Sequence, residues 1–138
     1  MDRDKNFSVI ILYNKDGKIL LEHRSKNRKR NPGIWALFGG HVEKGEDPKE
    51  AVFREVREEL GYKLSNTTLL YVQAVGDSRK NVFVELFDET QKLILDPEES
   101  QSYGWFALED TKGKGYSHDV EVFEKVGEYI NQQLNIKK

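Results

Sequence analysis

The sequence predicts an α/β fold in which a mixed β-sheet lies between helices. Segments rich in β-branched and aromatic residues alternate with polar turns, and they surround one strongly amphipathic helix. A second amphipathic helix closes the chain, so that helices are available for both faces of the sheet. Because the chain has 138 residues and no internal repeat or long linker, we expect one domain spanning residues 1–138.

The first expected elements form an antiparallel hairpin. Residues 7–13 are β-branched and apolar enough for a buried strand. The segment from Asn14 to Gly17 has the composition of a turn, since glycine can adopt the positive φ that such turns require. Residues 18–23 then return as the second strand.

A basic segment, RSKNRKR, follows at residues 24–30 and carries five basic side chains in seven positions. It is consistent with a solvated loop or with an electropositive rim that attracts a polyphosphate, and both alternatives stay open at this point. Arg24 is the best placed of these residues because it lies at the end of a strand. Residues 34–38 form a short strand that leads into a loop at Gly39-Gly40.

The best-defined element is a helix from Pro48 to Leu60. Asp47 is the expected N-cap, proline suits the first helical position, and Glu50 completes a capping box. Gly61 supplies the C-terminal stop. Apolar side chains recur at helical spacing, so one face packs on the sheet. These side chains are Val52, Phe53, Val56 and Leu60.

Three strands and the second helix complete the predicted fold. We expect strands at residues 67–75, 81–87 and 103–107, separated by polar turns. The second helix covers residues 119–134, where apolar side chains again repeat at helical spacing.

Composition limits the classes of function. The chain has no cysteine, which excludes disulfides, thiolate zinc sites and a thiol nucleophile. Its longest apolar run is too short to span a membrane, and the N-terminus is charged where a secretory signal would be apolar. We therefore expect a cytoplasmic protein without membrane contact. The net charge of −2 disfavours general nucleic-acid binding.

Carboxylates are crowded on one flank of the first helix. Glu55 and Glu59 are one turn apart, and Glu58 lies about 60° from Glu55 around the helix axis. Such like charges repel, and carboxylate oxygens on a rigid support suit a hard cation such as Mg²⁺. Arg54 lies four residues before Glu58 and can pair with it. A glutamate-rich helix can also be merely solvated, with Glu–Arg pairs that add little stability.

The spacing of these residues resembles the Nudix box, G-x5-E-x7-R-E-U-x-E-E-x-G-U, in which U is a bulky apolar residue. Gly40, Glu46 and the segment from Arg54 to Tyr62 occupy every fixed position. Tyr62 is aromatic where an aliphatic residue is usual, and Phe38 stands where many members have proline. The chain is thus similar to the Nudix hydrolases.

The resemblance implies an α/β/α sandwich and a hydrolase of phosphoanhydride bonds in nucleoside di- or triphosphate derivatives. Such a reaction uses Mg²⁺ or Mn²⁺ to neutralise phosphate charge, and a deprotonated water in line with phosphorus. Glu46 and Arg54 would orient the metal-binding glutamates and clamp the loop to the helix. The implied metal ligands are Glu55, Glu58, Glu59 and the backbone carbonyl of Gly39.

The general base differs among members of the family, and here we expect Glu55 or Glu58, with Glu99 as the alternative. Glu99 stands six residues before Trp105, where part of the family has a further ligand or base. Glu98 is next to it in the chain.

The resemblance also suggests substrate contacts. A basic residue at the end of the second strand is typical of members that hydrolyse nucleoside triphosphates, and Arg24 fits that place. Arg79 could stack on a nucleobase or be a solvated hairpin tip, and His118 could bind a base or cap the final helix. Residues 78–80 lack the proline or tyrosine of some subfamilies, which disfavours ADP-ribose and dinucleoside polyphosphates.

Two other functions remain as alternatives to hydrolysis of a small nucleoside polyphosphate. A non-catalytic nucleotide sensor usually lacks some box residues, whereas here all are present. A hydrolase of RNA caps or 5′-triphosphates would use a broad basic surface, of which the chain offers only residues 24–30. Prenyl-diphosphate isomerases of the same superfamily rely on cysteine and are excluded. The oligomeric state, monomer or homodimer, stays open.

Overall fold

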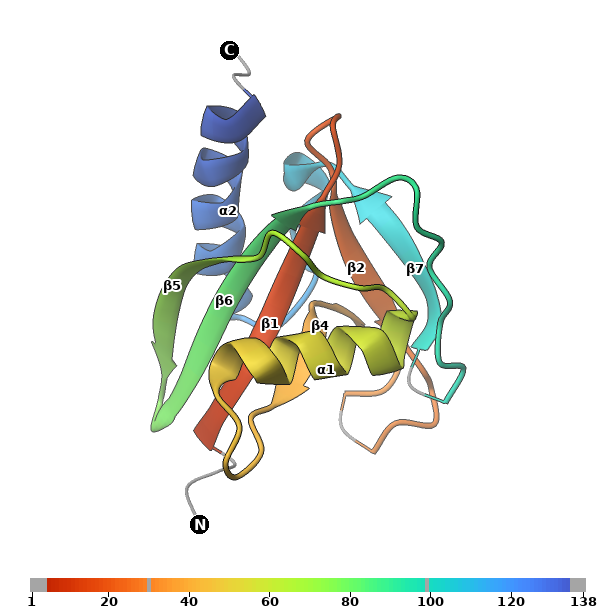
Figure 1. Cartoon of the computed structure of the whole chain (residues 1–138), viewed down its shortest axis with the longest axis vertical. Coiled ribbons are helices and arrows are strands. Elements are labelled where there is room, and N and C mark those ends of the chain that lie inside the picture. Colours follow the sequence, from red (N-terminus) through yellow and green to blue (C-terminus); the bar gives the residue numbers. More distant parts are fainter. Residues whose placement is uncertain (1–4, 30, 99, 135–138) are drawn as a thin grey trace.

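The computed structural model describes residues 5–29, 31–98 and 100–134, which form a seven-stranded mixed sheet between two helices (Figure 1). This arrangement confirms the predicted α/β fold. In chain order the elements are β1 (Asn6–Tyr13), β2 (Ile19–Arg24), β3 (Trp35–Ala36), β4 (Phe38–His41), α1 (Pro48–Leu60), β5 (Thr68–Val75), β6 (Ser78–Leu86), β7 (Ser100–Phe106), the 3-10 helix η2 (Leu108–Thr111) and α2 (Asp119–Leu134).

Strand β1 lies at the centre of the sheet. It pairs in parallel with β6 and antiparallel with β2 and β4. Strand β2 also pairs antiparallel with β3 and β7, and β5 forms the edge beside β6. The resulting order is β3-β2-β1-β6-β5, with β4 attached to β1 and β7 attached to β2. The β1–β2 pair is the predicted hairpin, and Gly17 in its turn has a φ of 79°.

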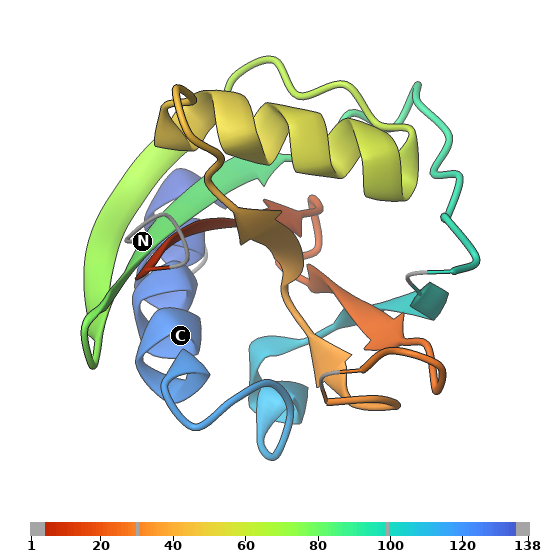
Figure 2. The same ribbon diagram turned by 90° about the horizontal axis from the view of Figure 1, so that it is seen from below.

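Each face of the sheet is covered by its own helix (Figure 2), and each has its own apolar cluster. Leu20 and Leu21 are neighbours in β2 but belong to opposite clusters, because successive strand residues point to opposite faces. Helix α1 contributes Val52, Val56 and Leu60 to one cluster, and α2 contributes Val122, Phe123, Val126 and Ile130 to the other.

Within the described ranges, no helix has the length and apolar character needed to cross a membrane.

Helix α1 begins and ends as predicted. The backbone amide of Glu50 donates to Asp47 Oδ1 at 2.8 Å, and the amide of Asp47 donates to Glu50 Oε1 at 3.0 Å, which completes the capping box. Gly61 adopts a left-handed φ of 61°, and its amide donates to the carbonyl of Arg57 at 3.0 Å. Both ends of the helix are therefore fixed by local hydrogen bonds.

The predicted glycine loop is wrong, because Gly39 and Gly40 lie within β4 and pair with β1. A Cβ built at Gly39 would lie 2.1 Å from the carbonyl oxygen of Ser8, and the φ of Gly39 is 150°. Glycine is needed here because the two backbones approach too closely for a side chain. The strand predicted at residues 34–38 is accordingly divided between β3, beside β2, and β4, beside β1.

Candidate active site

Arg54 is the centre of a charged network on α1. Its Nε donates to Glu46 Oε2 at 2.8 Å and its Nη2 donates to Glu46 Oε1 at 3.1 Å, so the two side chains form a bidentate pair. Nη2 also donates to the carbonyl of His41 at 3.1 Å. Arg54 thereby ties the segment between β4 and α1 to the helix.

The Arg54–Glu46 pair stabilises the charged form of both groups. Hydrogen bonds from Arg54 hold the pKa of Glu46 below the usual glutamate value. The Glu46 carboxylate in turn raises the pKa of the Arg54 guanidinium. The pair therefore stays ionised at neutral pH, and its geometry does not depend on small changes of pH.

The three glutamates that follow Arg54 lie at different depths. The Glu58 side chain is 60% exposed and that of Glu55 is 19% exposed. Glu59 is only 3% exposed and belongs to the buried residues of the helix. Arg54 Nη1 lies 3.0 Å from Glu55 Oε2 and 3.4 Å from Glu58 Oε1. One nitrogen of the guanidinium therefore bridges two of the three carboxylates.

These carboxylates have the chemistry of a site for a hard divalent cation. A Cβ built at Gly40 would lie 2.4 Å from Glu55 Oε2, so glycine at this position leaves room for the carboxylate in its present orientation over β4. The bridging guanidinium shows that Glu55 and Glu58 can approach one positive centre. In the part of the chain that the structure describes, no three His, Asp or Glu side chains are already grouped as a metal site. A shared cation would therefore require side chains to turn, above all the exposed Glu58.

Comparison with known proteins identifies the family of this chain. Residues 2–126 match the family model described as NUDIX domain. The chain belongs to the Nudix family. The nucleoside triphosphatase NudI of Escherichia coli is 36% identical to it over 74% of this chain and 82% of the relative.

Solved structures of MutT proteins have the same fold. A MutT NUDIX hydrolase from Burkholderia pseudomallei superposes with a TM-score of 0.70 at 30% identity, over 88% of this chain and 97% of that one. The MutT protein of Methanosarcina mazei superposes with a TM-score of 0.69 at 25% identity, over 96% and 95% of the two chains. The protein is thus a MutT-like Nudix hydrolase, with the α/β/α sandwich that the sequence predicted.

The predicted alternative base of this Nudix hydrolase, Glu99, lies outside the described residues. The adjacent Glu98 is exposed, and its amide donates to Asp96 Oδ1 at 3.0 Å. The amide of Asp96 donates to the carbonyl of Glu59 at 3.0 Å. The segment that leads into β7 therefore contacts the C-terminal end of α1, next to the box glutamates.

Arg24 lies at the end of β2, as predicted, but it is buried, with 10% of its side chain exposed. Its Nε donates to the carbonyl of Asn31 at 3.2 Å, and its Nη1 lies 3.6 Å from Glu22 Oε2. Arg30, at the other end of the basic segment, is outside the described residues. A contact between Arg24 and substrate therefore stays a prediction.

The other two predicted substrate residues lie elsewhere on the sheet. Arg79 is exposed in β6 and lines a polar hollow together with Lys5 and Asn6. His118 precedes α2 and stacks on Tyr116, with 5.4 Å between the ring centroids. His118 therefore belongs to the face covered by α2, whereas the box glutamates belong to the face covered by α1. The structure does not bring these two residues together with the glutamates.

A buried ion pair beneath α2 was not predicted from the sequence. Lys80 and Asp119 are in direct contact, and their side chains are 1% and 2% exposed. Lys80 Nζ also lies 2.8 Å from His118 Nδ1. Burial lowers the pKa of Lys80, and the carboxylate of Asp119 opposes this effect. The alternation of β6, in which Lys80 shares a face with the core residue Val82, is the signal that could have found it.

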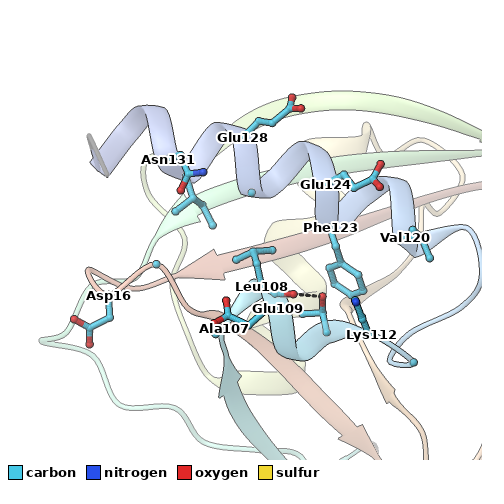
Figure 3. Close-up of a pocket in the computed structure, with 15 residues that line it drawn as sticks. Asp16, Ala107, Leu108, Glu109, Lys112, Val120, Phe123, Glu124, Glu128 and Asn131 are labelled. Atoms are coloured by element: carbon cyan, nitrogen blue, oxygen red, sulfur yellow. Dashed lines mark hydrogen bonds between the residues drawn. The ribbon is translucent and has the colours of Figure 1, made fainter. Parts of the chain in front are cut away.

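A hollow with an apolar floor lies between α2, η2 and the β1–β2 turn (Figure 3). Leu108 and Phe123 form part of its floor, and Glu124 and Glu128 of α2 lie along its rim. Its described lining residues include none from α1 or from the segment before α1. This hollow is therefore separate from the carboxylates of the Nudix box.

Proposed function

We propose that this Nudix hydrolase, acting as one domain, cleaves a phosphoanhydride bond of a nucleoside triphosphate in a Mg²⁺-dependent reaction. The arrangement of Glu55 over Gly40, with Arg54 bridging Glu55 and Glu58, is the observation that carries this proposal. The relative NudI, which shares 36% identity, is named a nucleoside triphosphatase, and this favours a triphosphate as substrate. We expect the enzyme to act in the cytoplasm on a small nucleotide.

Glu55, Glu58, Glu59 and the carbonyl of Gly39 are the groups that would hold Mg²⁺, or Mn²⁺ in its place. When bound, the cation neutralises phosphate charge and lowers the pKa of a nearby water. Arg54 keeps Glu55 and Glu58 oriented through the contacts described above.

A carboxylate takes the proton of the attacking water while the water oxygen bonds to phosphorus and the bridging P–O bond breaks. Glu55 and Glu58 are the expected bases, and Glu99 is the alternative. Removal of a general base typically lowers the rate by about 10²- to 10⁴-fold. Since Glu55 is less exposed than Glu58 and lies closer to Arg54, we expect Glu55→Gln to give the larger loss of kcat.

Three further residues are proposed as substrate contacts, at positions away from the box glutamates. Arg24 is expected near the phosphates, and Arg79 lines a hollow that also contains Lys5. His118 stacks on Tyr116, and such a platform could extend to a nucleobase. Arg24 lies in β2, Arg79 lies in β6 and His118 precedes α2, so these residues come from elements other than α1.

The test is a panel of nucleoside triphosphates and diphosphate derivatives, incubated with purified protein and Mg²⁺, with identification of the products. We expect a nucleoside monophosphate and pyrophosphate, or a phosphorylated leaving group, and loss of turnover in Glu55→Gln. Nucleotide binding without turnover, unchanged in Glu55→Gln and Glu59→Gln, would favour a sensor instead. Turnover confined to capped or 5′-triphosphorylated RNA, and abolished by substitution of Arg28 and Lys29, would favour the RNA-directed alternative.

A further inference from the structure

A second buried charged cluster lies where β2 meets β7. It consists of Glu22, Arg24 and Ser100, all of which are buried. Ser100 Oγ donates to Glu22 Oε1 at 2.6 Å, and Arg24 Nη1 lies 3.6 Å from Glu22 Oε2. A buried ion pair is often no more stabilising than apolar side chains of similar size. Stability alone therefore does not explain why these charged side chains are buried together.

An irregularity in the β2–β7 pairing completes this cluster. His23 lies opposite Ser102, but Arg24 lies opposite Ser100, so β7 contains one extra residue at this point. Residues directly opposite each other point to the same face of a sheet. Without the extra residue, position 101 would lie opposite Arg24 and Ser100 would point to the other face. The bulge thus brings the Ser100 hydroxyl to the face on which it reaches Glu22.

The cluster lies on the face of the sheet that carries α1. Leu20 of β2 packs in the same apolar cluster as Val56 of α1. Glu22 and Arg24 follow Leu20 at steps of two residues, which keeps them on that face. They therefore continue the row of β2 side chains beyond the apolar core, up to the point where the basic segment begins.

Polar groups on neighbouring segments hold the Arg24 side chain. The carbonyl of Asn31 accepts from its Nε at 3.2 Å, and the Glu22 carboxylate attracts its Nη1. The backbone amide of Arg24 also donates to the carbonyl of Ile34 at 2.8 Å. Glu22 is thus one of the groups that position the guanidinium, and Ser100 donates a hydrogen bond that helps to position Glu22.

We propose that Glu22 is a positioning residue, which holds the Arg24 guanidinium in the orientation that meets the phosphate chain of the substrate. This inference rests on the proposed function, since it concerns binding of the same nucleotide. Glu22 does not touch substrate, and it acts through Arg24. The bulge in β7 and the Ser100 hydroxyl are the parts of the fold that keep Glu22 in place.

The first experiment compares Glu22→Gln with a matched control, Glu85→Gln, using ATP and GTP. Glu85 is also buried, at 3% exposed against 1% for Glu22, and it accepts a hydrogen bond from Thr67 Oγ1 at 2.6 Å. Its other hydrogen bonds come from the amide of Ser65, so it resembles Glu22 without contacting Arg24. We expect Glu22→Gln to raise KM about tenfold with little change of kcat, because an interaction with a charged group is lost. Glu85→Gln should leave KM unchanged.

The second experiment is a double-mutant cycle of Glu22→Gln and Arg24→Met. If Glu22 acts only through Arg24, then Glu22→Gln has no further effect on KM in the Arg24→Met protein. Additive effects on KM would overturn the proposal. Because Arg24→Met leaves a buried carboxylate beside an apolar side chain, the double variant should unfold at a higher temperature than Arg24→Met alone.

The Kd of ATP and GTP, measured in EDTA so that turnover is prevented, separates this inference from the proposed function. Absence of turnover in the wild type would contradict the proposed function. The double-mutant cycle of Glu22→Gln and Arg24→Met would then be evaluated from the Kd values instead of KM. Unchanged Kd and KM in Glu22→Gln would contradict the inference even if the wild type is an active hydrolase. Ser100→Ala should weaken binding less than Glu22→Gln does, and Ser100→Thr, which keeps the hydroxyl, should restore it.

Discussion

The two faces of the sheet carry two very different charged clusters. Under α2, Lys80 and Asp119 are almost completely buried and in direct contact. On α1, Arg54 contacts several carboxylates, and one of them, Glu58, is largely exposed. The Lys80–Asp119 charges satisfy each other in the interior, and removal of one partner would leave the other buried and uncompensated. Charges that are held in place but remain open to solvent can also bind a cation and a phosphate.

The largest effect that this comparison predicts is on stability, at Lys80. Lys80→Met leaves the buried Asp119 without its ammonium partner, so we expect a loss of about 3–5 kcal/mol in the free energy of unfolding. Urea denaturation of the wild type and of Lys80→Met measures this difference in the free energy of unfolding. A loss below about 1 kcal/mol, as is usual for an exposed ion pair, would contradict the comparison.

On the α1 face the larger effect should be on activity. Arg54→Lys keeps the positive charge but cannot form the bidentate pair with Glu46, so the glutamates lose their fixed orientation. We expect kcat to fall by about 10- to 100-fold, in line with the effect of misplaced catalytic groups. The melting temperature should change much less than it does in Lys80→Met. A variant with wild-type kcat would show that the clamp does not position the catalytic carboxylates.

The smallest predicted effect is a pH dependence of stability from the α2 face. Burial and the neighbouring Lys80 ammonium hold the pKa of His118 below its usual value of 6.5, while Asp119 acts in the opposite direction. Gln73 donates to the His118 carbonyl and to Glu121 nearby. In the unfolded chain the imidazole takes up a proton near pH 6.5, but in the folded protein it does so only at lower pH. The contribution to stability is therefore complete above pH 6.5 and is lost as the pH falls below that value.

Melting temperatures measured between about pH 8 and pH 5 test this contribution of His118 to stability, because that interval contains the titration of histidine. His118→Gln should flatten the curve in that interval. If wild type and variant lose stability in parallel, other groups are responsible.

The sequence was most informative where structure is determined locally. Helix α1 was predicted to the residue because Asp47, Pro48, Glu50 and Gly61 act within a few positions of one another. Residues whose environment depends on distant strands were predicted less well. Gly39 and Gly40 were expected in a loop, but β1 pairs with them and makes them a strand.

Burial of charged residues was likewise not foreseen. Periodicity placed Glu59 beside the apolar stripe, whereas in the structure it lies within the buried face. Arg24 was expected at the end of a strand, in a segment consistent with a solvated loop or an electropositive rim, but its side chain is only 10% exposed and lies beside the Glu22 carboxylate. Such positions depend on which strands meet, and a single sequence carries no local signal for that pairing.

The most direct test of the account is calorimetric titration of Mg²⁺ into the wild type, Glu59→Gln and the control Glu85→Gln. Because the box carboxylates are proposed to hold the cation, we expect the wild type and Glu85→Gln to bind Mg²⁺ with the same affinity. Glu59→Gln should bind it at least about tenfold more weakly, as expected for loss of a charged ligand. Equal Mg²⁺ affinity in all three proteins would contradict the assignment of the α1 carboxylates as the catalytic metal site.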